Sequence, residues 1–172
     1  MKYFRKIQGE RLYLSPMNKD DVEIFTKWLN DKETTKYLPH YHQVITLAAE
    51  QEWLDKPVSN GQHYAMVTND DVLIGSIGLM EINHMNRTAT LGLFIGDKEQ
   101  RGKGYGTEAI RLLIEYGFNT LNLQNIMLTV QTDNEQGIAC YKKVGFKEFG
   151  RRSKCNFRDG KYIDLIYMEI LS

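Results

Sequence analysis

The most informative stretch of the sequence is Gln100-Arg101-Gly102-Lys103-Gly104-Tyr105-Gly106-Thr107, which places three glycines within five residues between an apolar run and a helical pattern. Glycine accepts positive φ and lets a ligand approach the backbone closely. The first N–H groups of a helix are unpaired and favour an anion. The stretch therefore predicts a phosphate cradle, to which Arg101 and Lys103 add positive charge and Thr107 adds a hydroxyl donor.

Two familiar phosphate motifs do not fit this stretch. A Walker A loop needs four residues between its first glycine and Gly-Lys-Ser/Thr, and the dinucleotide fingerprint needs Gly-x-Gly-x-x-Gly. A flexible connection with incidental glycines is the alternative interpretation. The position between a strand and a helix favours the cradle.

Apolar periodicity on either side of the cradle predicts a mixed order of strands and helices. The expected helices are Gly106–Phe118, Asn134–Val144 closed by Gly145, Asp20–Leu29 and a weaker one over Thr46–Leu54, with Tyr37–His42 as a loop. The expected strands are Arg11–Leu14 ended by Ser15-Pro16, His63–Thr68, Val72–Ile82, Thr88–Ile95, Ile126–Gln131, Phe146–Gly150 and Tyr162–Ile170. Tight turns are expected at Asn69-Asp70-Asp71 and at Asp159-Gly160. The pattern predicts an α+β fold around one sheet, with a strand–helix–strand crossover at its centre.

The length and net charge of the chain limit the functional classes to which the protein can belong. The chain has 172 residues, which suits a single domain over residues 1–172. It carries 22 Lys and Arg against 22 Asp and Glu, so no global field favours nucleic acid or an anionic membrane as a partner. Neither a signal peptide nor an apolar run of about 18 residues is present, and two cysteines form no disulfide framework, which together predict a cytoplasmic protein. The spacing of four histidines and two cysteines predicts no metal site.

The cradle also carries a family resemblance. Arg101-x-x-Gly104-x-Gly106 resembles motif A of the GNAT acetyltransferases, and Asn134-x-x-x-x-Ala139-x-Tyr141-x-x-x-Gly145-Phe146 resembles the segment that follows it in that family. The resemblance implies a mostly antiparallel sheet, flanked by helices and splayed at an acetyl-CoA cleft. It implies that the glycine turn binds the pyrophosphate, that Asn134 contacts the cofactor arm, and that Phe94 and Ile95 lie near the thioester and pantetheine.

Other segments are similar to one branch of that family. The tail from Asp159-Gly160 through Met168 and the stretch Trp28-Leu29-Asn30-Asp31 resemble the ribosomal-protein and polyamine acetyltransferases. The stretch Glu81-Ile82-Asn83-His84 is similar to spermidine acetyltransferases in particular. The resemblance covers essentially the whole chain, and its motifs are specific for the superfamily but weak for the substrate.

Catalytic roles follow from what acyl transfer to an amine requires. The departing thiolate needs a proton, and the resemblance favours Tyr141 as its donor over an ordinary core tyrosine. Many relatives carry Glu where this chain has Thr90, so the identity of the general base is left open. Either Glu81 or His84 acts as the base through a water molecule, or the amine binds in its neutral form and needs no base. Gly92 is expected to mark a bulge that opens the cleft.

The predicted function is acetyl transfer from acetyl-CoA, as cosubstrate and without a metal, to a primary amine. Candidate acceptors are a polyamine, a protein N-terminus, an amino sugar or an aminoglycoside. The segment Lys36–His42 contains no carboxylate, which counts against a polycation. A catalytically weak CoA-binding sensor or interaction protein is the alternative from another class, and a nucleotide-binding protein is a third. A homodimer is left open.

Overall fold

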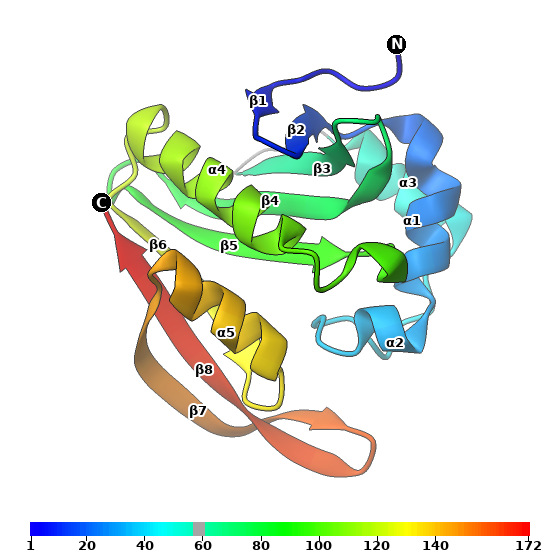
Figure 1. Cartoon of the computed structure of the whole chain (residues 1–172). Coiled ribbons are helices and arrows are strands. Elements are labelled where there is room, and N and C mark those ends of the chain that lie inside the picture. Colours follow the sequence, from blue (N-terminus) through cyan, green and yellow to red (C-terminus); the bar gives the residue numbers. More distant parts are fainter. Residues whose placement is uncertain (57–60) are drawn as a thin grey trace.

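A computed structural model describes residues 1–56 and 61–172, in which all strands form one sheet (Figure 1). The sheet has eight strands in the order β1-β2-β3-β4-β5-β6-β8-β7, and the only parallel pair is β5 with β6. The strands are β1 Ile7–Gln8, β2 Leu12–Pro16, β3 Gln62–Thr68, β4 Leu73–Asn83, β5 Thr88–Ile95, β6 Asn125–Gln131, β7 Lys147–Arg158 and β8 Lys161–Leu171. The mixed, mostly antiparallel sheet confirms the predicted fold class.

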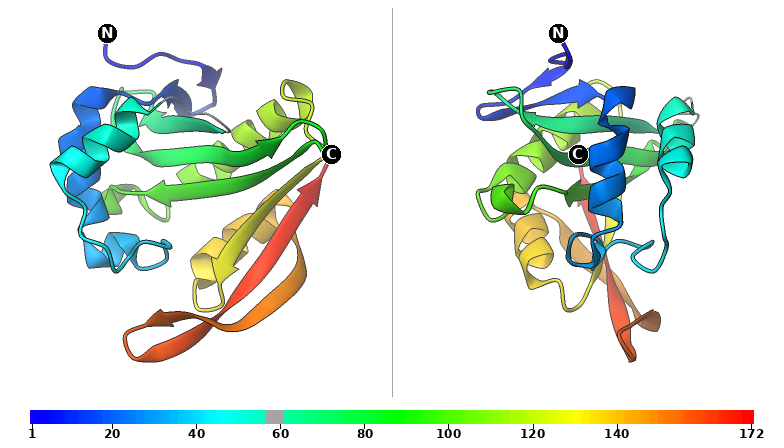
Figure 2. Two further views of the ribbon diagram at one scale, coloured as in Figure 1. Left: turned by 180° about the vertical axis from the view of Figure 1, so that it is seen from behind. Right: turned by 90° about the vertical axis from the view of Figure 1, so that its right-hand side faces the viewer.

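Helices cover both faces of the sheet, and Figure 2 shows α4 and α5 on one side of it and α3 on the other. The helices are α1 Val22–Leu29, α2 Lys32–Thr35, α3 Leu47–Asp55, α4 Tyr105–Asn119 and α5 Glu135–Val144, with short 3-10 turns η1 Lys19–Asp21 and η2 Lys98–Gln100. The predicted helices are confirmed, whereas α2 was not expected. It is a single turn, in which the Asp31 carboxylate caps the Thr34 N–H at 2.8 Å.

Two hydrophobic clusters follow from the alternation of side chains along the strands. The larger one joins α4 to the sheet through residues such as Leu79, Leu91, Ile110 and Leu113. The smaller one joins α1 to the opposite face through Phe25, Trp28, Val67 and their neighbours. Phe94 packs against this smaller cluster, so β5 contributes side chains to both faces.

The parallel pairing between β5 and β6 is short. It joins Thr88–Thr90 to Asn125–Met127 and then stops, although both strands continue. Beyond this point β6, β8 and β7 diverge from the rest of the sheet, as Figure 1 shows. The splay that the family resemblance implies is therefore present, opened by the loss of pairing after three residue pairs.

The predicted bulge at Gly92 is wrong. Gly92 pairs with Gly78 in unbroken register, and the irregularity lies in β4, between Met80 and Asn83. There two residues, Glu81 and Ile82, face one residue of β5, and Glu81 adopts a φ of +52°. Strand periodicity could not locate this bulge, because a left-handed Glu carries no sequence signal of its own.

The N-terminal strands also differ from the prediction. Ser15 and Pro16 do not end β2 but pair with Ala65 and Tyr64 of β3. Because β1 pairs only with Tyr13 and Leu14, the missing N–H of Pro16 removes no bond on that side.

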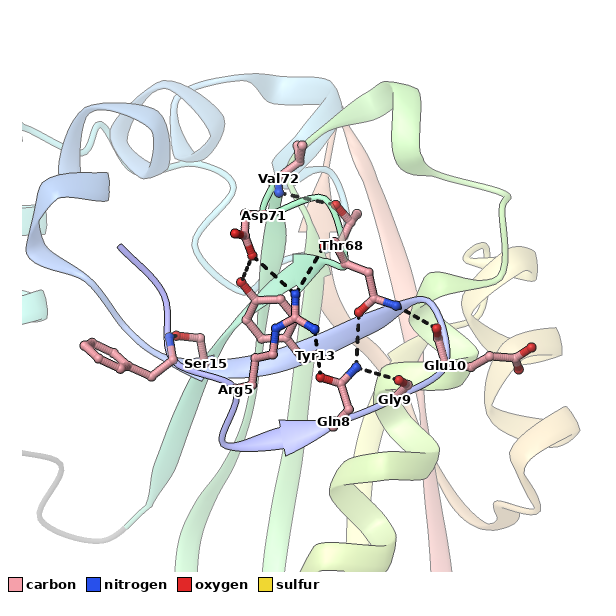
Figure 3. Close-up of polar contacts among 11 residues, drawn as sticks. Arg5, Gln8, Gly9, Glu10, Tyr13, Ser15, Thr68, Asp71 and Val72 are labelled. Atoms are coloured by element: carbon pink, nitrogen blue, oxygen red, sulfur yellow. Dashed lines mark hydrogen bonds and ion pairs between the residues drawn. The ribbon is translucent and has the colours of Figure 1, made fainter. Parts of the chain in front are cut away.

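Figure 3 shows the polar network that holds this edge. The Arg5 guanidinium lies 4.7 Å from the centre of the Tyr13 ring, and the Tyr13 hydroxyl donates to Asp71 at 2.5 Å. Gln8 donates to Asn69 at 3.1 Å. The two-residue strand β1 is thus fixed by contacts with the β3–β4 turn, which sequence periodicity cannot reveal.

The C-terminal hairpin is longer than expected. Strand β7 runs to Arg158 rather than to Gly150, and its register with β8 shifts twice, between Glu148 and Gly150 and between Arg152 and Asn156. These irregularities break the period that a strand prediction relies on. The turn at Asp159-Gly160 is confirmed, with φ of +49° and +77°.

We predict that Gly96→Ala destabilises the fold. A Cβ at this position would lie 2.1 Å from the Trp28 indole, a rigid ring that packs with Phe25 and Phe94. Overpacking of this kind costs about 1–3 kcal/mol. Urea unfolding should show this loss for Gly96→Ala and none for Gly150→Ala, where nothing lies within 4 Å of the added methyl. Equal stability of the two variants would contradict the packing argument.

Candidate functional site

The glycine turn joins the end of β5 to the first turn of α4. Gly102 and Gly104 both have positive φ, +74° and +86°, and Gly104 is the N-cap of α4. No side chain in the described parts of the chain caps this helix, so its first N–H groups have no protein partner. A Cβ on Gly102 would meet nothing within 4 Å. The turn is therefore an open nest of backbone donors at the positive end of a helix dipole.

Arg11 holds the turn from the start of β2. Its Nη1 donates to the Lys103 carbonyl at 2.8 Å, and its guanidinium lies 5.1 Å from the centre of the Tyr105 ring. Its Nε donates to Glu108 in α4 at 2.9 Å. Burial opposes ionisation of Glu108, but the hydrogen bonds from Arg11 outweigh it, and the pKa of Glu108 lies below its ordinary value. Sequence reasoning missed Arg11, because only the fold brings it to the turn.

The side chains of the predicted cradle residues have other partners. Arg101 donates from Nε and Nη2 to the Ile95 carbonyl at 3.0 and 2.9 Å, and from Nη2 to Thr34 at 3.0 Å. Lys103 donates to Gln100 at 3.3 Å. The Thr107 hydroxyl lies 3.2 Å from the Cys140 thiol, which links α4 to α5. The open donors of the turn are thus its backbone N–H groups.

The inner edges of β5 and β6 face each other across the splay. After Thr90 and Met127, neither strand has a partner on this edge among the described strands. Phe94 and Ile95 lie on this part of β5 and pair on the other side with Ser76 and Gly75. An unpaired strand edge presents N–H and C=O groups that an extended ligand can bond.

Helix α5 follows β6 and carries two predicted residues. Asn134 is its N-cap and accepts the Gly137 N–H at 3.0 Å through Oδ1. Tyr141 packs edge-on against Phe146, with ring centres 6.0 Å apart. Burial, and secondarily the nearby Cys140, raises the pKa of Tyr141 to about 12, and its hydroxyl has no partner within residues 1–56 and 61–172. At neutral pH this phenol is a protonated, unused donor.

A cavity of about 560 Å³ opens on the opposite face of the sheet, between the strands and the helices α1 to α3. It reaches β5 at Gly92–Phe94, which is the unpaired edge of the splay. Its other walls are mostly apolar and aromatic, including Phe25, Leu38, Ile45 and Trp53. The splay and the cavity therefore meet at the same residues of β5.

Glu81 and His84, the two candidates for the base on the amine side, lie outside this cavity. Neither Glu81 nor His84 lines it, and both are exposed. The bulge nevertheless turns Glu81 toward β5, where its Oε2 accepts a hydrogen bond from the Thr90 hydroxyl at 3.0 Å. Thr90 is two residues from Gly92 and shares its face of the strand. His84 lies in the turn after β4, with no comparable contact in the described structure.

A second feature that sequence reasoning missed bridges the two halves of the sheet. Arg158 at the end of β7 is buried and paired with Asp133, and it donates to the Lys36 carbonyl at 2.8 Å. Its guanidinium also lies 5.2 Å from the centre of the Tyr37 ring. The segment after α2 is thereby tied to the hairpin across the mouth of the splay.

Membrane-spanning helices and metal-binding clusters are both absent from residues 1–56 and 61–172. Across the described residues, no helix is both long and apolar enough to span a membrane. In the same ranges, no group of three or more His, Cys, Asp or Glu side chains is placed to hold a metal ion.

Comparison with known proteins assigns this chain to a family. The model of the acetyltransferase (GNAT) domain matches residues 11–147. The spermidine N(1)-acetyltransferase of Escherichia coli K12 is 30% identical over 158 residues, covering 90% of this chain and 83% of that protein. A Bacillus subtilis protein that bears the name "Putative ribosomal N-acetyltransferase YdaF" is 31% identical to this chain. The match covers 84% of this chain and 76% of that protein.

A solved structure agrees with this assignment. The spermidine N-acetyltransferase of Vibrio cholerae, in complex with CoA and spermine, superposes with a TM-score of 0.85 at 26% identity, covering 94% of this chain and 95% of that one. The open glycine turn, the unpaired edge of β5 and the matching family model lead to one conclusion: this chain belongs to the GNAT family of acetyltransferases.

Proposed function

We propose that this protein transfers the acetyl group of acetyl-CoA to a primary amine that enters through the cavity beside α3. The observation that carries the proposal is the alignment of three features along β5. The glycine turn lies beyond its C-terminal end, its unpaired edge follows, and the cavity opens at Gly92–Phe94. A cofactor bound at the turn and extended along that edge presents its thioester to the cavity.

The residues present fit acetyl-CoA. The backbone of Gly102 to Thr107 offers donors to the pyrophosphate, because α4 begins there without a cap. The edge at Phe94 and Ile95 offers N–H and C=O groups to the amides of the pantetheine arm. The Oδ1 atom of Asn134 caps α5, which leaves its Nδ2 to donate to that arm. Arg101 positions the turn through the Ile95 carbonyl.

Starting from an ammonium, the nitrogen loses two protons: one before it attacks, and one from the tetrahedral intermediate, which balances the proton that reaches sulfur. The amine nitrogen attacks the thioester carbonyl, the C–N bond forms, and the C–S bond breaks. A backbone N–H on the unpaired edge of β5 stabilises the oxyanion. Tyr141 donates its proton to the departing thiolate, because its hydroxyl has no partner among the described residues and its raised pKa keeps it protonated until then.

The incoming ammonium must also lose a proton, so a proton acceptor is needed on the amine side of the thioester. Glu81 supplies a carboxylate at Thr90, where the family resemblance leads one to expect a Glu on the strand itself. The carboxylate therefore comes from β4 instead of β5, carried there by the bulge. Because Glu81 is exposed and Thr90 occupies one of its oxygens, we assign it to proton transfer through water rather than to direct contact.

The names of the relatives support a polyamine as the acetyl acceptor. Two of them are named for spermidine, and the Vibrio cholerae structure contains spermine. The apolar and aromatic cavity suits the methylene segments of such a molecule, and its aromatic faces attract ammonium groups.

Gly104→Ala should weaken CoA binding about 10-fold or more in isothermal titration calorimetry. The added Cβ lies 3.2 Å from Arg11, whose guanidinium holds the turn. Gly160→Ala is the matched control: its φ of +77° imposes a similar strain of about 1–2 kcal/mol, with nothing within 4 Å. Both variants should lose similar stability. An equal loss of CoA affinity in both would refute the assignment of the turn.

Tyr141→Phe tests acetyl transfer itself. We expect kcat for CoA release with an amine panel of polyamines, peptides and amino sugars to fall by roughly 10²–10⁴-fold, with CoA affinity unchanged. Product mass identifies the acetylated amine. Unchanged kcat would remove Tyr141 from the mechanism, and CoA binding without turnover of any amine by the wild type would favour the sensor alternative.

Glu81→Gln should make the reaction depend on free amine. At neutral pH we expect kcat/KM to fall about 10- to 100-fold, with the deficit shrinking as pH rises toward the amine pKa near 10. The exposed Glu115→Gln on α4 serves as control. The double change Glu81→Gln with Thr90→Glu returns a carboxylate to the same place and should restore activity. A deficit that is constant with pH would count against a proton-transfer role.

A further inference from the structure

Helix α3 carries three acidic residues, and two of them have cationic partners. Glu52 pairs with Lys56 at 2.9 Å, and Asp55 pairs with Lys19. The third, Glu50, is only 5% exposed, and its carboxylate has neither a hydrogen bond nor an ion pair within the described residues. The most buried acid of the helix is therefore the unpaired one.

An unpaired buried carboxylate does not help the protein to fold. Solvent still reaches its carboxylate oxygens, which are not among the fully buried atoms without a partner, but partial burial disfavours the ionised form at a cost in free energy and raises the pKa of Glu50 above its ordinary value. The N-terminal end of the α3 dipole offsets part of this cost, because Glu50 lies in the first turn. A group kept at a cost to stability is a candidate for ligand binding.

The surroundings of Glu50 indicate what it binds. It lines the 560 Å³ cavity, whose lining includes no Lys or Arg and no other Asp or Glu among the described residues. His63 lies in the same lining, and burial lowers its pKa, so it is neutral at neutral pH. Trp53 packs edge-on against His63 with ring centres 5.4 Å apart. The cavity thus presents one acidic side chain among mostly apolar and aromatic walls, with His40, Gln43 and Ser76 as further polar residues of its lining.

We propose that Glu50 is the acceptor-specificity residue, which pairs with a second ammonium group of an amine whose first nitrogen reacts at Gly92–Phe94. The inference rests on the proposed function and deepens it. One carboxylate matches one retained positive charge, and the apolar walls between Glu50 and β5 match a methylene spacer. The acceptor class is a diamine or polyamine with an aliphatic spacer rather than a monoamine.

The test compares acceptors that differ by one ammonium group. Steady-state kinetics with diaminobutane and butylamine, and with diaminopentane and pentylamine, are measured for wild type, Glu50→Gln and Glu52→Gln. Glu50→Gln should raise KM for each diamine on the order of 10- to 100-fold and leave KM for each monoamine unchanged. Glu52→Gln, on the exposed side of the same helix, should behave as wild type.

Thermal unfolding of the ligand-free protein separates binding from a structural role. Glu50→Gln should be as stable as wild type or more stable, because it removes an unpaired buried charge. A wild type that prefers diamines, with this preference kept by Glu50→Gln, would overturn the inference while leaving acetyl transfer intact. A wild type that acetylates no amine would instead overturn the proposed function.

Discussion

The short parallel contact between β5 and β6 is the constraint on which the rest of this structure depends. Three residue pairs, from Thr88 to Thr90, hold the two halves of the sheet together, and the strands then separate. The crossover through α4 fixes their order and direction. The separated edges carry backbone donors and acceptors without strand partners, and a sheet accepts this only where another polar partner replaces the missing strand. A cofactor with an extended amide arm meets that requirement.

Cationic side chains shape the glycine turn of the proposed cofactor site without being its main donors. Arg11 and Arg101 direct their guanidinium groups at the Lys103 and Ile95 carbonyls, so they shape the glycine turn from behind. The donors that remain open are backbone N–H groups, whose positions are fixed by the fold and lose no side-chain entropy on binding. Arg158 does comparable work at the other end, where it ties the segment after α2 to the hairpin.

The proposed site for the amine differs from the glycine turn, because few charged side chains lie in or beside its mostly apolar cavity. Glu81 reaches Thr90 only because a bulge rotates it out of the β4 ladder, and Glu50 lies alone among aromatic walls. A charge interacts more strongly in such apolar surroundings than in water, which applies to Glu50 in the cavity but not to the exposed Glu81. The two acids also lie on different elements, which is compatible with the proposed division between proton transfer and selectivity.

Local periodicity and short motifs were enough to predict the order of the main elements, the glycine turn, the α5 segment with Asn134 and Tyr141, and the family. Four features could be seen only in the folded chain: the position of the bulge, the place of Ser15 and Pro16 in a strand, the support of the turn by Arg11, and the lack of a partner for Glu50 among the described residues. These features depend on contacts between residues far apart in the chain, and burial or pairing of a charge has no local pattern from which it can be read.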